Sequence, residues 1–125
     1  MIVVRRAGPT DADAISALNN DVQAVHATAI PWRFKAPGAD TFPPSEIAKL
    51  MQAAHIAFFL AEYDEVPAGY LLAEVQRRKE TSQTYAHDMV YVHHDSVQPA
   101  LRRHGIGRAL LGAATIPLSV SKSWC

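Results

Sequence analysis

The spacing of hydrophobic positions changes along the chain, and each change marks a new element. Short apolar runs between turn signals predict four strands, at residues 2–5, 56–63, 68–77 and about 84–97. A helical period predicts one helix from Thr10 or Asp11, which suit an N-cap, to about Ala27. A second helix is predicted to begin at Pro44, because proline suits the first helical turn. Strands and helices therefore share one chain of 125 residues.

Each predicted helix carries one apolar face, which we expect to pack on the core. The inward positions are Ile15, Leu18, Val22 and Val25 in the first helix, and Ile47, Leu50, Met51 and Ala54 in the second. Residues 31–44 lie between the helices and contain four prolines and Gly38, which predicts a loop. Polar residues 78–82 predict the turn that precedes the fourth strand.

Composition limits the size and the class of the protein. With 125 residues, 49% of them hydrophobic, the chain is expected to form a single domain over residues 1–125. Acidic and basic residues balance at 12 each, and no aromatic residues interleave the cationic run 77–79, which argues against nucleic acid. No apolar stretch approaches the roughly 18 residues that span a bilayer. The N-terminus lacks the apolar segment of a signal peptide, and the single Cys125 allows no internal disulfide. We therefore expect a cytoplasmic protein.

The segment from Arg102 to Arg108 carries the strongest functional signal. It places Gly105 and Gly107 between an expected strand and an expected helix. A helix N-terminus presents unpaired N–H groups and the positive end of the helix dipole, so it attracts phosphate. Glycine permits close approach of a ligand, and arginine adds charge-assisted hydrogen bonds. From residue 96 onward there is no acidic residue to oppose the cations, which are Arg102, Arg103, Arg108 and Lys122.

Two other glycine-rich motifs do not fit this segment. A P-loop would require Gly-x-x-x-x-Gly-Lys-Ser/Thr, and a dinucleotide-binding turn would require a third glycine and a later acidic residue. Neither pattern is present. An ordinary strand-to-helix turn with exposed arginines remains the simplest alternative for the two glycines alone.

The residues around the glycines resemble a known family. Val97-x-Pro99, then Arg102-x-x-Gly105-x-Gly107, then Ala109-Leu110-Leu111 is similar to the acyl-CoA-binding signature of the GCN5-related N-acetyltransferases (GNAT). The resemblance extends over residues 2–114 and includes the opening Ile2–Ala7 and the strand-like runs 58–62 and 68–73. It implies an α/β fold of the α+β type, with a mixed, mostly antiparallel central sheet flanked by helices.

The resemblance also implies a cosubstrate and a reaction. The reaction would be acetyl transfer from acetyl-CoA to a primary amine of an unidentified small or peptide acceptor, by direct attack and without a metal. The pantetheine arm would pair with the strand end, and the pyrophosphate would bind the glycine turn. The implied acetyl-CoA residues are Asp95, Ser96, Val97, Arg102, Arg103, His104, Gly105, Ile106, Gly107 and Arg108. In this family the loop after the first helix lies near the acceptor, so Trp32, Arg33 and Phe34 are candidate substrate contacts; the alternative is that these aromatics close the rim of the core.

The titratable groups at the end of the fourth strand are the candidates for catalysis. A neutral amine must attack the thioester, so a base or a water chain has to remove its proton. His93, His94 and Asp95 are the available groups. Strict alternation predicts that His93 and Asp95 share one face of the sheet and that His94 takes the other. Neighbouring strand residues on opposite faces do not easily bind one ion, so a metal site is not expected. Histidines that merely form hydrogen bonds are the alternative.

The end of the sequence departs from the family pattern. A family member continues with further strands after the signature, whereas here the last helix is expected to stop near Thr115, before Pro117. Residues 116–125 form an atypical tail, for which we favour a short strand with Ile116, Leu118 and Val120 alternating. A fold without its C-terminal strands would leave the fourth strand as an exposed edge, which predicts a homodimer. The alternative function is a non-catalytic acyl-CoA-binding or interaction module.

Overall fold

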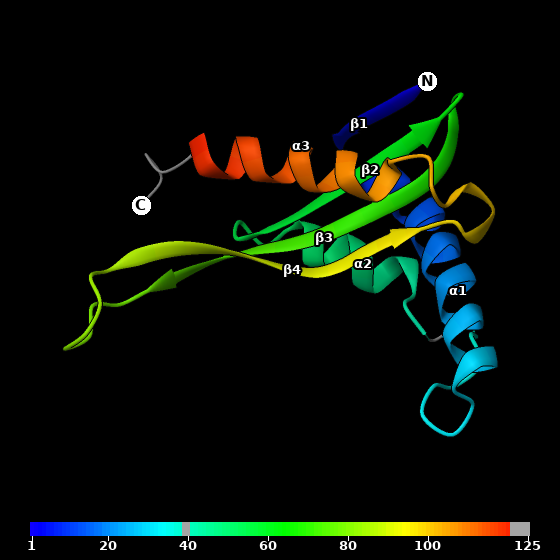
Figure 1. Ribbon diagram of the computed structural model, residues 1–125, viewed down its shortest axis with the longest axis horizontal. Helices are drawn as coiled ribbons and strands as arrows, with labels where there is room; N and C mark the ends of the chain where they lie inside the picture. The colour runs from blue at the N-terminus through cyan, green and yellow to red at the C-terminus, as the bar shows by residue number, and fades with distance from the viewer. Residues whose placement is uncertain (39–40, 121–125) are drawn as a thin grey trace.

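A four-stranded antiparallel sheet forms the centre of the molecule. The computed structural model describes residues 1–38 and 41–120. The strands are β1 (Ile2–Arg6), β2 (Ile56–Tyr63), β3 (Val66–Arg78) and β4 (His87–Val97). They lie in the order β1-β2-β3-β4, with every neighbouring pair antiparallel (Figure 1). The four predicted strands are therefore confirmed, with β4 beginning three residues later than predicted.

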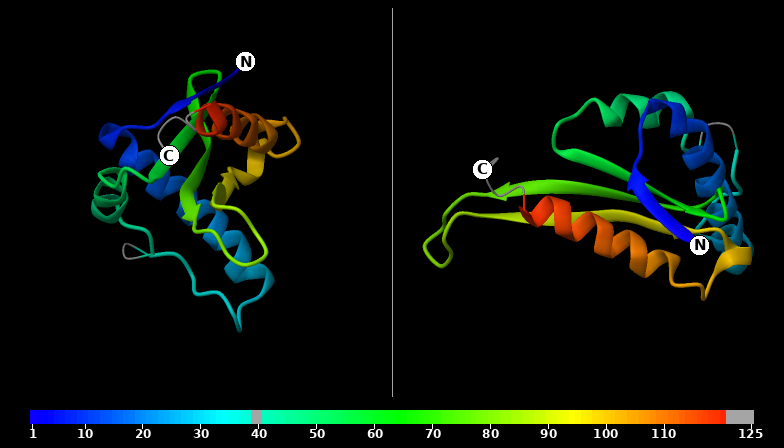
Figure 2. Two further views of the ribbon diagram at one scale, coloured as in Figure 1. Left: turned by 90° about the vertical axis from the view of Figure 1, so that its left-hand side faces the viewer. Right: turned by 90° about the horizontal axis from the view of Figure 1, so that it is seen from above.

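Three helices cover the two faces of this sheet. The helices α1 (Ala12–Ala29) and α2 (Pro44–Met51) pack on one face, and α3 (Ile106–Val120) packs on the other (Figure 2). Two short 3₁₀ turns, Pro9–Asp11 and Pro99–Leu101, precede α1 and α3. This arrangement confirms the predicted α+β class with helices on both sides of a mostly antiparallel sheet.

The alternation of side chains along β2 and β3 builds two separate cores. Phe58, Leu60, Tyr70 and Leu72 are buried against α1 and α2. Phe59, Ala61, Leu71 and Ala73, the intervening residues, are buried against α3. Both faces of the central strands are thus covered, which explains why their sequences are continuously apolar.

The apolar faces predicted for the first two helices are correct near their centres. Ile15, Leu18 and Ile47 are buried. Val22 and Val25 are only half-buried, because the C-terminal half of α1 extends beyond the sheet (Figure 1). Ala54 was predicted to face inward, but α2 ends at Met51 and Ala54 is exposed in the turn before β2.

The prediction for the end of the chain was wrong in two respects. The helix α3 does not stop near residue 115 but continues through Pro117 to Val120, so residues 116–120 are helical rather than a strand. A proline inside a helix removes one hydrogen bond, but its fixed φ near −65° is compatible with helical backbone, so a helix can continue past it. The rest of the predicted tail strand, residues 121–125, lies outside the described residues.

One position in β3 fixes how closely β3, β4 and α3 approach one another. A Cβ atom at Gly69 would lie 2.8 Å from the carbonyl oxygen of Ser96 and 3.2 Å from the side chain of Ile106. A main-chain oxygen has little freedom to move away. Only glycine therefore fits at this crossing.

We predict that Gly69→Ala lowers the free energy of unfolding by about 1–3 kcal/mol, the usual cost of overpacking. Gly112→Ala is the matched control, since a Cβ there meets nothing within 4 Å and the position is inside α3. That control is expected to stabilise the protein by up to about 1 kcal/mol. Urea denaturation measures both changes. A Gly69→Ala protein as stable as the wild type would show that β4 can move away from β3 at low cost.

Candidate functional site

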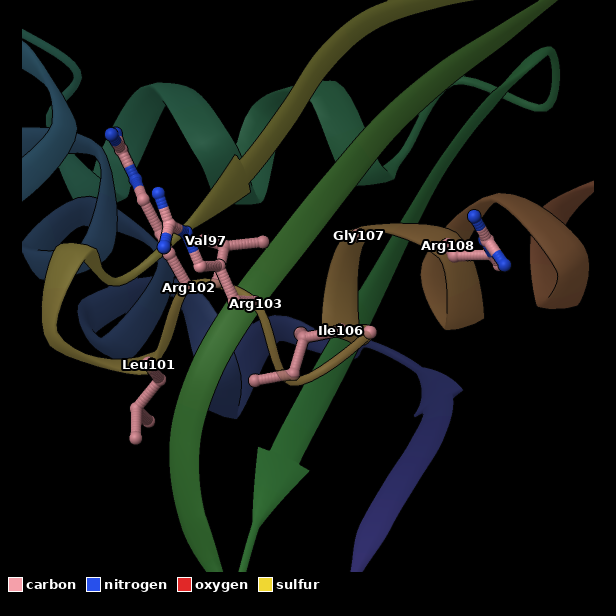
Figure 3. A pocket seen from close by; sticks show the side chains of 8 residues that line it. Val97, Leu101, Arg102, Arg103, Ile106, Gly107 and Arg108 are labelled. Carbon is pink, nitrogen blue, oxygen red and sulfur yellow. The ribbon is translucent and has the colours of Figure 1, made fainter.

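A hollow of about 500 Å³ lies at the N-terminus of α3, where the sequence predicts phosphate binding. The residues that line it are Val97, Leu101, Arg102, Arg103, Gly105, Ile106, Gly107 and Arg108. Figure 3 shows Arg102 and Arg103 beside the end of β4, and Arg108 on the first turn of α3. All three guanidinium groups belong to exposed residues. Most of the predicted acetyl-CoA residues therefore line one hollow, which we call the arginine hollow.

The backbone of the turn gives the arginine hollow its exposed N–H groups. Ala109 N–H donates to the Gly105 carbonyl at 3.0 Å, which places Gly105 at the start of the helix. The N–H groups of the three residues between them have no carbonyl one turn earlier in the helix. Gly105 has φ of +78° and Arg103 has φ of +70°, both in the left-handed region. This conformation is ordinary for glycine but costs free energy at arginine.

Three predicted acetyl-CoA residues do not line the arginine hollow. The His104 Nδ1–H group donates to the carbonyls of Leu101 and Arg102, and the His104 ring packs edge-on with Tyr63, with 5.1 Å between the ring centres. Its side chain thus braces the turn. Asp95 and Ser96, near the C-terminal end of β4, line a neighbouring hollow instead.

This neighbouring hollow, of about 480 Å³, brings together the predicted catalytic residues. We call it the histidine hollow. It is lined by Val22, His26, His93, His94, Asp95, Ser96, Val97 and Arg102. Val97 and Arg102 line both hollows, so the two adjoin at the end of β4. The α1 residues Val22 and His26 were not predicted as site residues, because nothing in the sequence of α1 indicates which turn lies beside β4.

An irregularity in the β3–β4 pairing overturns the predicted orientation of the two histidines. Leu72 pairs with His94, but Ala73 pairs with Val92, which leaves His93 as an extra residue in β4. A bulge of this kind interrupts strict alternation. His93 and His94 consequently lie on the same face of the sheet, the one that packs on α1 and α2. There His93 contacts Glu74, and His94 contacts Tyr70.

Asp95 lies on the opposite face of the sheet from these two histidines. It pairs with Leu71, and its carboxylate lies beside Gly107 of α3. Partial burial raises the pKa of Asp95. Since Gly107 lies in the first turn of α3, the Asp95 carboxylate is near the start of this helix, where the helix dipole favours a negative charge.

His94 is the more enclosed of the two histidines. Its Nδ1 lies 2.8 Å from the Tyr70 hydroxyl, and its ring packs edge-on against Phe42 and Tyr70. Burial, and then the neighbouring His93, lower the pKa of His94 below its ordinary value. His94 is therefore mainly neutral at neutral pH.

His93 is bound differently. Its Nε2 lies 2.9 Å from Glu74 Oε1, and His55 Nε2 lies 3.7 Å from the other oxygen of the same carboxylate. The hydrogen bond with His93 is the main reason that the pKa of Glu74 is lowered. Among the described residues, no three histidine, cysteine or acidic side chains form a group that could hold a metal ion.

The loop residues predicted to contact substrate separate into two environments. Arg33 and Phe34 line a third hollow next to the end of α1, with the Arg33 guanidinium 5.3 Å from the Phe34 ring centre. Phe34 also packs against His26 at 5.0 Å, and His26 lines the histidine hollow. Trp32, in contrast, is 85% exposed. The contact between Phe34 and His26 therefore links the linings of the third hollow and the histidine hollow.

Comparison with known proteins gives one family and many similar folds. The sequence model of the acetyltransferase (GNAT) family matches residues 22–115. Comparison with curated protein sequences gave no match. Within the described residues, no helix has the length and apolar character needed to cross a membrane.

Several solved structures share the fold. A tetramutant of a Bacillus halodurans protein is 20% identical, with a TM-score of 0.79, over 97% of this chain and 76% of that one. An acetyltransferase from Vibrio fischeri is 18% identical, with a TM-score of 0.72, over 95% and 88% of the two chains. A predicted acetyltransferase with acetyl-CoA from Clostridium acetobutylicum is 12% identical, with a TM-score of 0.70, over 97% and 75%. The TM-scores demonstrate a common fold. The family model covers most of the sequence, so the protein belongs to the acetyltransferase (GNAT) family.

Proposed function

We propose that this protein binds acetyl-CoA and transfers its acetyl group to a primary amine. The observation that carries the proposal is the arginine hollow at the N-terminus of α3. Exposed N–H groups, a glycine at positive φ and three arginines form a cationic surface suited to a pyrophosphate. Family membership and the fold shared with the Clostridium acetobutylicum structure, which contains acetyl-CoA, support this assignment.

We assign cosubstrate binding to the arginine hollow and the reacting groups to the adjoining histidine hollow. The arginine hollow would hold the nucleotide end of the cosubstrate, and the main chain of Asp95, Ser96 and Val97 would pair with the pantetheine arm. The histidine hollow would then contain the reacting groups, with His93, His94 and Asp95 as the catalytic candidates. Transfer joins the amine nitrogen to the acetyl carbon and breaks the carbon–sulfur bond, while a proton leaves the nitrogen and another is gained by the sulfur.

The acceptor would approach from the loop after α1. Arg33 and Phe34 line the third hollow, and Phe34 packs against His26, which lines the histidine hollow. Trp32 is exposed beside them and is free to cover a bound acceptor. This arrangement favours an acceptor that has an apolar or aromatic group next to its amine, where it would contact Phe34 and Trp32. The homodimer and the cytoplasmic location stay predictions.

Isothermal titration calorimetry with acetyl-CoA tests the proposal directly. We expect saturable binding, with an affinity that weakens as salt screens the arginines. Release of free CoA in the presence of a panel of primary amines then measures transfer. Binding with no release for any amine would favour the non-catalytic acyl-CoA-binding module, and no binding at all would overturn both functions.

A further inference from the structure

The buried hydroxyl of Tyr70 joins two polar side chains, one from each of two other elements. Asn19 Nδ2 of α1 donates to the Tyr70 oxygen at 2.9 Å, and His94 Nδ1 of β4 lies 2.8 Å from the same oxygen. Ser96 pairs with Tyr70 across β3 and β4, and its side chain lowers the pKa of Tyr70. Tyr70 itself is completely buried. Its hydroxyl is therefore held between α1 and β4.

The donors and acceptors in this group determine where the protons lie. An amide NH₂ can only donate, so Asn19 occupies one lone pair of the Tyr70 oxygen. Burial raises the pKa of Tyr70, so the phenol keeps its proton and must donate it. The imidazole nitrogen of His94 is a stronger acceptor than the hydroxyl of Ser96. The phenol proton consequently belongs in the hydrogen bond to His94 Nδ1.

We propose that Tyr70 is a positioning residue that fixes neutral His94 with its proton on Nε2, so that His94 offers the histidine hollow a hydrogen-bond donor rather than a base. Neutral imidazole carries one proton, and a nitrogen that accepts a hydrogen bond cannot hold it. The edge-on contacts with Phe42 and Tyr70 hold the ring in this orientation. The tautomer follows from the contacts of Tyr70 with Asn19 and His94; its use in acetyl transfer rests on the proposed function.

A donor at this position would act on oxygen. Nε2–H of His94 can stabilise the negative charge that develops on the thioester oxygen when the amine attacks. The amine proton then needs another acceptor, and the histidine hollow offers His26 and His93, or a water that they hold. His94 would remain neutral throughout, which agrees with the lowering of its pKa by burial.

Several charged or titratable groups surround His94 and can influence its protonation. His26 lies on α1, and Arg102 lies in the turn before α3. On β4 itself the neighbours are His93 and Asp95, and His93 is in turn bound to Glu74 of β3. Tyr70 is the group that contacts Nδ1 directly. Its effect can therefore be separated from theirs by one substitution.

Nitrogen-15 NMR of the histidine side chains tests the proposal without any ligand. In the wild type at neutral pH we expect the chemical shifts of His94 to report a protonated Nε2 and an unprotonated Nδ1. In Tyr70→Phe the preference for this tautomer should weaken. The pKa of His94 should also rise, by up to about one pH unit, because the lost hydrogen bond had favoured the neutral form.

The direction of the pKa change separates the two possible roles. If His94 instead donated from Nδ1 to Tyr70, the bond would favour the protonated ring, and Tyr70→Phe would lower the pKa of His94. A protonated Nδ1 in the wild type, or a pKa that falls or stays constant in Tyr70→Phe, would overturn the proposal. Tyr85→Phe is the matched control, since Tyr85 is 86% exposed at the β3–β4 turn. Backbone amide spectra show whether each variant is folded. Because acetyl-CoA is absent, this result is independent of whether the protein proves to be an acetyltransferase.

Discussion

Gly105→Val is expected to weaken acetyl-CoA binding by about 10- to 100-fold. Gly105 has φ of +78°, a conformation that a β-branched residue adopts only at a cost of about 1–3 kcal/mol. The variant would relieve that strain by changing the turn, and the N–H groups at the start of α3 would no longer converge. Restoring the turn on binding would cost the same free energy, and each 1.4 kcal/mol corresponds to a factor of ten in affinity.

A second effect of Gly105→Val acts in the same direction. A Cβ atom at Gly105 meets no protein atom within 4 Å, and the residue lines the arginine hollow. The methyl groups of valine would therefore occupy space that the proposed pyrophosphate needs. Gly8→Val is the matched control: Gly8 has φ of −115° and ψ of 178°, a conformation that suits valine, and a Cβ there also meets nothing within 4 Å.

Titration calorimetry measures the affinity of both glycine variants, and thermal unfolding shows whether they remain folded. We expect Gly8→Val to bind acetyl-CoA like the wild type. If Gly105→Val is folded and binds equally well, the arginine hollow is not the site of the pyrophosphate. Binding that survives there would direct attention to the histidine hollow and the loop after α1.

The turn that forms the arginine hollow was predictable because the residues that determine its conformation are adjacent in sequence. Gly105, Gly107 and the arginines act through a turn whose conformation depends on a few adjacent residues. The strands around Phe58 and Leu71 were predictable for the same reason, since continuous apolar runs indicate strands covered on both faces. The orientation of His93 and His94 was not, because it depends on an extra residue in the pairing of β4 with β3. A register irregularity is a property of two strands together, and neither sequence alone indicates it.

The polar contacts of His94 were beyond local sequence patterns for a related reason. Tyr70 lies in an apolar strand and Asn19 lies in an amphipathic helix, so each resembles an ordinary residue of its element. Only the packing of α1 on the sheet brings Asn19 to the Tyr70 hydroxyl. The end of α3 illustrates the opposite error, in which a local rule was applied too strictly: Pro117 predicts a helix end, but the helix continues to Val120.

Two substitutions of His94 distinguish a hydrogen-bond donor from a general base in the proposed acetyl transfer. His94→Phe should lower kcat for acetyl transfer by about 100-fold or more, the usual loss when one preorganised donor to a developing oxyanion is removed. Phenylalanine keeps a ring between Phe42 and Tyr70, so packing should change little. The affinity for acetyl-CoA should stay within a factor of about two, since His94 does not line the arginine hollow.

His94→Gln distinguishes the two roles, because its amide NH₂ can donate but cannot take up a proton at neutral pH. If His94 is a donor, glutamine should restore part of the activity that phenylalanine loses. If His94 is the base, both variants should be equally impaired. The wild-type pH profile provides a second criterion. The pKa of His94 is lowered, so a base at this position would lose activity only as the pH falls through that lowered value, whereas a donor keeps its Nε2 proton on both sides of it. Steady-state kinetics of CoA release, with exposed His87→Gln as the control variant, therefore decide whether His94 acts as a proton acceptor or as a hydrogen-bond donor to the oxyanion.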